Sequence, residues 1–294
     1  MIKNKCIGML IGGGIGDVLG SQNENLTFNE INTRGVKHLF PTSARYTDDT
    51  EMTLVLGQHL IEESGTINLV KLHKSYKHAI NNGSRGYSSK TRSILGNYHE
   101  FVLAGDASTN GAIMRISPLA LKNYTVDCEL TADIKQAIYC THGHSKDAID
   151  TAYVYVKILK ALLINRFSTG LEIYNYMLEV AARTRNARLF PILKLTGKIN
   201  FKKQESLTSQ LFGFELFQIE AIDCLACAIF CFLFNFKNPQ QAIIMAANCG
   251  GDTDTIAKLT GELVGAQNGI DWIPTEWKTF EGRHQLEAMA LKLI

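Results

Sequence analysis

The 294-residue sequence predicts an all-α fold. Apolar residues recur mostly with the 3.6-residue period of a helix, and alternating runs typical of strands are scarce. Only 5 prolines interrupt the chain, and we find no internal repeat or low-complexity linker. We therefore expect residues 1–294 to form one all-helical domain, at the upper end of the size range for a single core.

Composition excludes several classes of protein. Hydrophobic residues make up 46% of the chain, which is enough to bury a core. The formal net charge of +2 creates no overall field typical of nucleic-acid or anionic-membrane binding. Seven scattered cysteines do not resemble the disulfide framework of a small secreted domain. We predict a cytoplasmic monomer with no nucleic-acid or membrane partner.

The first helix is expected over residues 6–20. Its glycines recur every four residues, at Gly8, Gly12, Gly16 and Gly20. On a helix they form a bare stripe that lets another backbone approach closely, although each glycine costs about 0.5–1 kcal/mol of helix stability. No spacing matches a phosphate-binding glycine motif. Asp17 and Glu24 belong either to a solvated surface or to a site.

Two acidic motifs lie far apart in the sequence. Residues 47–50 read Thr-Asp-Asp-Thr at the expected start of a helix, where they could simply cap it. Capping explains one acid, but two adjacent carboxylates repel each other unless a cation or a donor is near. Residues 250–255 read Gly-Gly-Asp-Thr-Asp-Thr, and their glycines allow a tight, non-helical entry that aims two acids inward. Together the motifs indicate an oxygen-ligand site for hard cations.

Further polar segments have open interpretations. The loop at residues 81–92 is an ordinary connection or part of a pocket mouth. The small residues at 105–111 lead into an expected helix whose free N–H groups would suit an anion, and Arg115 in that helix needs a partner. His142 is placed at a helix start, with a structural role as the alternative.

Residues 225–236 form the longest apolar run and predict a core helix, because a bilayer-spanning helix needs about 20 residues. Cys224, Cys227 and Cys231 occur at helical spacing around the start of this run. We interpret them as buried small residues and not as a redox or zinc motif, since no second ligand pair is present.

Five ordered blocks resemble the ADP-ribosylglycohydrolase family, which contains dinitrogenase-reductase-activating glycohydrolase and the ADP-ribosyl-acceptor hydrolases. The blocks are residues 8–20, 47–50, 110–119, 141–142 and 250–257, followed by Gly261 and Gly265. The resemblance implies a single compact orthogonal helical bundle with a binuclear Mg²⁺ or Mn²⁺ centre.

The resemblance also implies roles for individual residues. The expected metal ligands are Thr47, Asp48, Asp49, Asp252, Asp254 and Thr255. Glu24 and Asp49 are the expected proton-handling residues, and the expected substrate-binding residues are Gly86, Tyr87, Ser88, Asn110, Gly111 and His142. Ser88 stands where many relatives have glycine, so the resemblance specifies the metal centre better than the acceptor.

The resemblance implies a hydrolase that removes ADP-ribose from modified proteins, most often from arginine. The alternatives are hydrolysis of O-linked ADP-ribose, on serine or in O-acetyl-ADP-ribose, and a non-catalytic ADP-ribose-binding or structural relative. Hydrolysis of a phosphate ester is a further option. All four aspartates and both threonines are present, which favours an enzyme.

Overall fold

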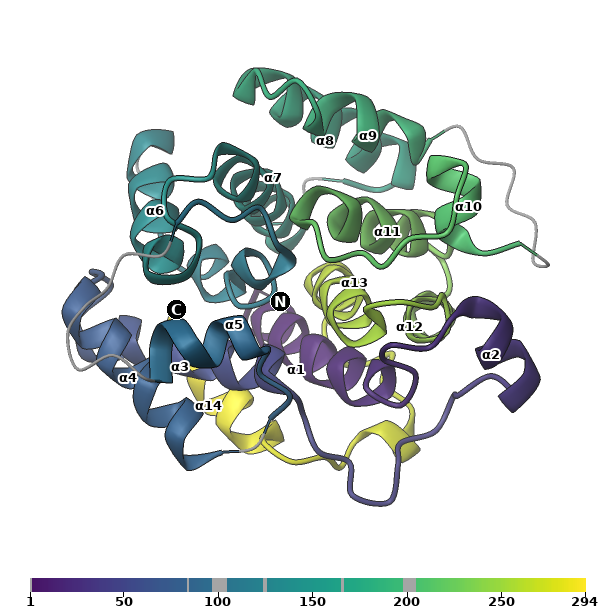
Figure 1. Cartoon of the computed structure of the whole chain (residues 1–294), viewed down its shortest axis with the longest axis horizontal. Helices are drawn as coiled ribbons and strands as arrows, with labels where there is room; N and C mark the ends of the chain where they lie inside the picture. The colour runs from purple at the N-terminus through teal and green to yellow at the C-terminus, as the bar shows by residue number, and fades with distance from the viewer. Residues whose placement is uncertain (1, 84, 97–104, 124–125, 165–166, 198–204) are drawn as a thin grey trace.

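The computed structural model describes residues 2–83, 85–96, 105–123, 126–164, 167–197 and 205–294. These residues form helices and connecting turns, with one isolated antiparallel bridge between Thr109 and Glu220 (Figure 1). The predicted all-α fold class is confirmed. None of the described helices is both long enough and apolar enough to cross a membrane.

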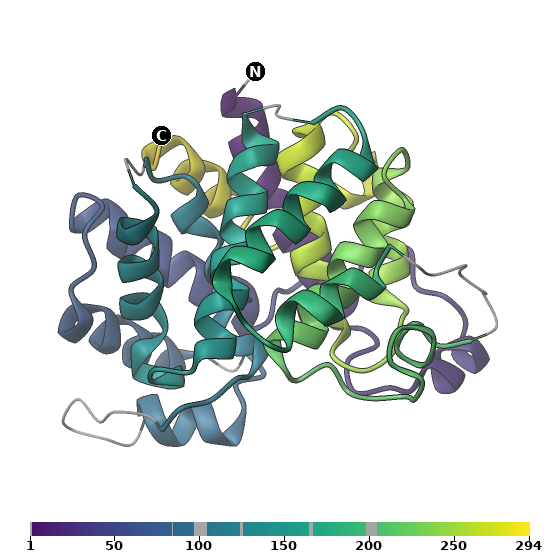
Figure 2. The same cartoon turned by 90° about the horizontal axis from the view of Figure 1, so that it is seen from above.

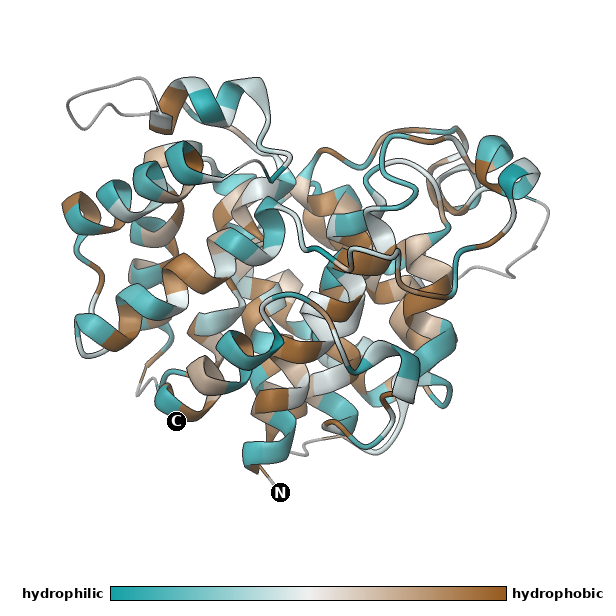
Figure 3. Cartoon of the chain, turned by 90° about the horizontal axis from the view of Figure 1, so that it is seen from below, coloured by the Kyte–Doolittle hydropathy of each residue, from teal (hydrophilic) through white to brown (hydrophobic). Residues whose placement is uncertain are grey.

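The first half of the chain contributes α1 (Ile2–Gly20), α2 (Phe28–Arg34), α3 (Asp48–Glu62), α4 (Leu69–Asn82), α5 (Ser89–Thr91), α6 (Asp127–His142) and α7 (Lys146–Leu163). The second half contributes α8 (Gly170–Thr184), α9 (Leu189–Leu195), α10 (Leu207–Phe212), α11 (Ala221–Phe234), α12 (Pro239–Ala247), α13 (Thr253–Asn268) and α14 (Arg283–Lys292). Short helical turns are η1 (Arg92–Gly96), η2 (Asn110–Ala112), η3 (Ser117–Ala120) and η4 (Thr275–Trp277). Brown and teal segments alternate along many helices in Figure 3, as expected for helices with one buried side.

Helices α1 and α13 run antiparallel at the centre, and their backbones touch (Figure 1). A Cβ atom built on Gly12 would lie 2.2 Å from the carbonyl oxygen of Gly261. One built on Gly16 would lie 2.0 Å from the carbonyl oxygen of Ala257. The predicted role of the glycine stripe is therefore confirmed, and α13 is its partner. This contact brings the end of α1 beside the start of α13.

The core extends from α13 onto α11 and α7. Helix α11 carries residues 225–234 of the predicted apolar run of residues 225–236, and its side chains are buried as far as Phe232. Cys224, Cys227 and Cys231 are fully buried in it as free thiols, which confirms their interpretation as core residues. Viewed from above, the connections preceding α3 and α13 lie toward the lower edge of the molecule (Figure 2), the side that faces the reader in Figure 1.

Two local predictions were wrong. Residues 112–120 do not form a continuous helix, because the backbone follows two short turns, η2 and η3, with Pro118 inside the second. His142 does not start a helix but ends α6, where Gly143 with φ +56° breaks the helix. Both deviations place polar groups at the cavity described next.

Candidate active site

The N-termini of α3 and α13 meet at a cavity of about 360 Å³. This volume lies within the range of about 300–1,000 Å³ that is typical of small-molecule sites. The structure brings most of the predicted site residues to it, namely Glu24, Asp48, Asp49, Gly86, Ser88, Asn110, Gly111, His142, Asp252, Asp254 and Thr255. Two acidic motifs separated by about two-thirds of the chain thus share one wall.

The start of α3 is held by a buried carboxylate on α1. Asp17 Oδ1 accepts a hydrogen bond from the backbone N–H of Thr47 at 3.0 Å, and Asp17 Oδ2 accepts one from Thr50 at 3.0 Å. Thr47 is the N-cap residue, and its hydroxyl accepts the N–H of Asp49 at 3.3 Å. The interpretation of Asp17 as a surface residue is wrong, since it is fully buried where α1 meets α3.

The start of α13 is formed by the two glycines of the second acidic motif. Gly250 and Gly251 have φ values of +85° and +84°, which favour glycine, so the predicted non-helical entry is confirmed. Gln218 Oε1 then accepts the N–H of Asp252 at 3.0 Å. A Cβ atom on Gly251 would lie 2.1 Å from the same oxygen, so a side chain there would displace Gln218 from Asp252.

The carboxylates of the two helix starts are crowded together and largely buried. The Thr255 hydroxyl donates to Asp49 Oδ1 at 3.4 Å, which links α13 to α3. Burial raises the pKa of Asp49 and of Asp254 well above the usual value, and neighbouring carboxylates raise both further. Burial followed by the charge of Asp17 raises the pKa of Asp48 to about 8.

Glu24 lies at the mouth of the cavity with an exposed side chain. Partial loss of hydration raises its pKa, and the carboxylate of Asp252 raises it further. A carboxyl group in this position can hold a proton near neutral pH more readily than an isolated glutamate. It therefore suits the predicted role in proton transfer.

The chemistry of these side chains fits divalent cations. Asp49 Oδ2 is buried without a hydrogen-bond partner among the described residues, as expected of an atom reserved for a ligand. Carboxylate and hydroxyl oxygens are the donors that Mg²⁺ and Mn²⁺ prefer. In the described chain, no three His, Cys, Asp or Glu side chains converge closely enough to enclose a metal. The acids would therefore have to turn toward a common cation.

Polar side chains gather around His142 at another part of the cavity wall. Its Nε2 lies 2.9 Å from the Thr109 hydroxyl and its Nδ1 lies 2.7 Å from the Thr141 hydroxyl. Burial, followed by the positive charge of Arg115, lowers the pKa of His142 well below its usual value. The imidazole is consequently neutral and serves as a hydrogen-bonding wall and not as a charged group.

Asn110 and Arg115 complete that wall. The Asn110 side-chain amide donates to Asp252 Oδ2 at 2.5 Å and to the carbonyl oxygen of Gln218 at 2.9 Å. Arg115 is buried, and its guanidinium donates to the carbonyl oxygen of Gly111 at 2.6 Å and stacks over the Tyr76 ring. Arg115 was expected to need a partner, and its partners are neutral groups and an aromatic ring.

The structure does not place Thr47 and Tyr87 on the cavity wall. Tyr87 is buried beside it, and its hydroxyl donates to Glu51. Gly86, with φ +91°, does reach the cavity, and a Cβ there would lie 3.5 Å from Asp48 Oδ1. Ser88 caps α5 by accepting the N–H of Thr91 at 3.1 Å. The loop therefore contributes backbone and a hydroxyl, and its tyrosine supports the loop from behind.

Sequence analysis missed Gln218, which supports both Asp252 and Asn110. It lies on a non-helical segment without periodicity, so no local pattern indicates its role. We expect Gln218→Ala to weaken Mg²⁺ binding about 10–100-fold, because residues that orient metal ligands typically contribute that much. Calorimetric titration with Mg²⁺ measures this effect. Gln240→Ala is the control, since Gln240 lines none of the cavities described here, and equal affinity in both variants would contradict the assigned role.

The fold and the cavity together define an all-helical protein with an acidic, oxygen-lined cleft. The family model for ADP-ribosylglycohydrolase matches residues 1–294, and the chain belongs to this family. ADP-ribosylarginine hydrolase Tri1 of Serratia proteamaculans is 27% identical over 293 residues, covering 93% of this chain and 74% of that protein. ADP-ribosylhydrolase ARH3 of Homo sapiens is 23% identical, covering 84% of this chain and 78% of that protein.

A solved structure agrees with this assignment. The chain is similar to one described as an ADP-ribosylglycohydrolase-related protein complex, with a TM-score of 0.71 and 25% sequence identity. The similarity covers 99% of this chain and 97% of that one. The predicted family is confirmed, and with it the prediction of an enzyme of the glycohydrolase class.

Proposed function

We propose that the protein is a metal-dependent hydrolase that removes ADP-ribose from modified proteins by cleaving the N-glycosidic bond of ADP-ribosyl-arginine. The observation that carries the proposal is the meeting of Asp48 and Asp49 with Asp252 and Asp254 in one cavity. Crowded, buried acids are unfavourable unless a cation or proton compensates them. The similarity to an ADP-ribosylarginine hydrolase supports the choice of linkage.

In this proposal two Mg²⁺ or Mn²⁺ ions are held by the predicted ligands Thr47, Asp48, Asp49, Asp252, Asp254 and Thr255. When bound, such ions orient ribose hydroxyls and make a nearby water more acidic. Five of the six ligands line the cavity, whereas Thr47 caps α3 behind them. The hydroxyl oxygen of Thr47 accepts the Asp49 N–H and has a second lone pair for a cation.

Glu24 and Asp49 are the proposed proton-handling groups. Cleavage of a glycosidic bond passes through an oxocarbenium-like state, and it requires one group to accept the water proton or to protonate the leaving nitrogen. Glu24 is accessible for either role, because it is exposed at the cavity and its hydrogen bond is to the neighbouring Asn25. Asp49 has an unpaired oxygen but is fully buried.

The other walls are proposed to hold the ADP-ribosyl group. Asn110, Gly111 and the loop of Gly86 and Ser88 offer hydrogen-bonding groups for ribose and diphosphate. Lys90, in the short helix α5 that follows this loop, also lines the cavity. A positive side chain beside backbone groups suits a diphosphate better than an uncharged substrate.

Hydrolysis of O-linked ADP-ribose is the second candidate, because the chain is also similar to ADP-ribosylhydrolase ARH3, whose name is not limited to arginine. The test is to incubate the purified protein and Mg²⁺ with arginine-linked and serine-linked ADP-ribosyl peptides and with O-acetyl-ADP-ribose, and to measure released ADP-ribose. We expect the arginine-linked peptide to be cleaved fastest. Faster cleavage of either O-linked substrate would select the alternative, and release from none would reject both.

A further inference from the structure

A second cavity of about 230 Å³ opens beside the candidate active site, between α2 and α10. The two cavities share a wall formed by residues 24–27 and 250–252. Gly250 and Gly251 line the small cavity, whereas the next residue, Asp252, lines the large one. In the same way Thr27 lines the small cavity and Glu24 the large one. The small cavity therefore begins where the acidic site ends.

An exposed apolar segment joins the two cavities. Phe217 lines the small cavity and Ile219 lines the large one, and these side chains are 44% and 54% exposed. Gln218 between them is buried and bonded to Asp252, while the backbone of Ile219 accepts the N–H of Asn110 at 2.7 Å. The segment is thus held firmly while it presents two large apolar side chains to solvent. Their place at the two cavities makes them candidate contacts for a binding partner.

The position of the carboxylates determines which part of a substrate contacts the small cavity. On the proposed function, the ADP-ribosyl group fills the large cavity and its reacting bond lies at the carboxylates. The acceptor must then leave past Glu24 and Asp252, whose segments form the wall shared with the small cavity. The volume of the small cavity is below the range of about 300–1,000 Å³ for small-molecule sites, so it suits amino-acid side chains better than a nucleotide.

The charge of the small cavity limits the kind of acceptor. Among the described residues that line it, Glu215 is the only charged one, and the carboxylate of Glu24 lies on the other side of the shared wall. Phe217 lines the same cavity and offers an aromatic ring. A carboxylate next to an aromatic ring binds guanidinium groups, by an ion pair and by stacking.

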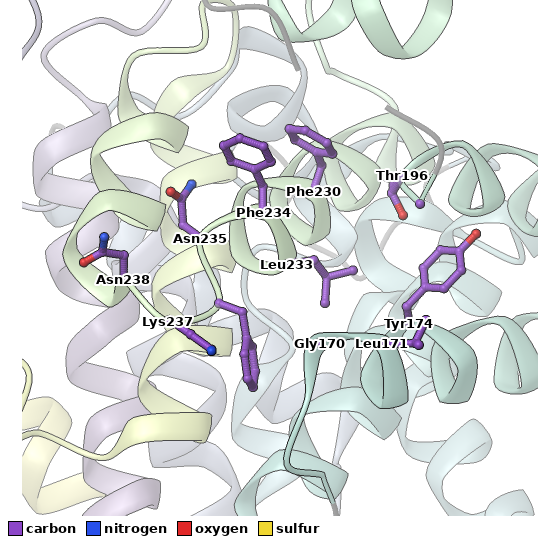
Figure 4. A pocket seen from close by; sticks show the side chains of 12 residues that line it. Gly170, Leu171, Tyr174, Thr196, Phe230, Leu233, Phe234, Asn235, Lys237 and Asn238 are labelled. Atoms are coloured by element: carbon purple, nitrogen blue, oxygen red, sulfur yellow. The ribbon is translucent and has the colours of Figure 1, made fainter. Parts of the chain in front are cut away.

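We propose that the small cavity, with Phe217 and Glu215, is the docking site for the acceptor polypeptide, and that it selects a basic segment around the modified arginine. This inference rests on the proposed function and adds the place where the modified protein binds. A larger apolar groove of about 560 Å³ between α8 and α11 includes Leu171 and Phe234 (Figure 4). None of the residues that line that groove is next in sequence to a residue that lines the active-site cavity, as Gly251 is to Asp252, so the groove provides the control.

The test compares two substrates: free ADP-ribosyl-arginine and a basic peptide that carries the same linkage. For Phe217→Ser, we expect the ratio of kcat/KM for the peptide to kcat/KM for the free compound to fall about tenfold, typical of the loss of one interface anchor. For Glu215→Gln, we expect a smaller fall that disappears at high salt. Leu171→Ser, at a side chain that is 68% exposed, and Glu276→Gln are the matched controls and should preserve the ratio.

A binding measurement separates this inference from the proposed function. Fluorescence anisotropy with the unmodified basic peptide requires no hydrolysis. Weaker peptide binding by Phe217→Ser than by Leu171→Ser supports the docking site even if no substrate is cleaved, in which case only the proposed function fails. An unchanged substrate ratio, or equal peptide binding by both variants, overturns the docking site and leaves the proposed function standing.

Discussion

Asp254→Asn is expected to lower kcat/KM for ADP-ribosyl-arginine about 10³-fold, which corresponds to about 4 kcal/mol of transition-state stabilisation. Asp254 is buried at the start of α13 and lines the cavity beside Asp49. The amide has the same shape but cannot supply the negative charge that the proposed cations require. Steady-state release of ADP-ribose measures the loss, and Asp271→Asn, at an exposed position, is the control.

The same substitution should not unfold the protein. The folded state raises the pKa of Asp254, so the native protein binds this proton more tightly than the unfolded chain does. The stability of the metal-free protein therefore falls as pH rises from about 4 toward the folded-state pKa, and Asn removes that penalty. Thermal unfolding in a chelator should give Asp254→Asn an equal or higher Tm at pH 7. A large loss of Tm there would indicate a structural role.

Gly12→Ala is expected to destabilise the fold by about 3 kcal/mol or more. A Cβ atom at Gly12 would lie 2.2 Å from the carbonyl oxygen of Gly261, and a backbone atom cannot move aside as a flexible side chain can. The higher helix propensity of alanine offsets only about 1 kcal/mol of this cost. Urea unfolding monitored by circular dichroism measures the change.

Gly105→Ala is the control for Gly12→Ala, because a Cβ atom at Gly105 would meet no heavy atom of the described residues within 4 Å. Its stability should stay within about 0.5 kcal/mol of the parent protein, as is usual for surface substitutions. Similar stability of the two variants would contradict the close contact between α1 and α13.

The fold was predictable from the sequence because helical periodicity and glycine spacing are local signals. The stripe of α1 indicated close approach to a helix, but the identity of the partner depends on a contact between opposite ends of the chain. Residues 112–120 show the limit of such signals. Their apolar pattern suits a helix, yet Pro118 and the hydrogen bonds of neighbouring segments favour separate turns.

The candidate site was predictable where residue types are unusual together, as in the paired acids. The role of a residue was not predictable where it depends on the direction of its side chain or on a partner far away in the sequence. Tyr87 is adjacent in sequence to two cavity residues, yet its hydroxyl turns to Glu51. Gln218 supports Asp252 from 34 positions away, and nothing in its own segment marks it.

Metal-dependent hydrolysis is tested most directly by measuring ADP-ribose release from an arginine-linked peptide as Mg²⁺ is added back to chelator-treated protein. We expect negligible release without metal and a saturable rise with Mg²⁺, which Asp254→Asn abolishes. Release that continues unchanged after chelation would contradict the proposed metal centre. No release at any Mg²⁺ or Mn²⁺ concentration would contradict the proposed hydrolysis itself.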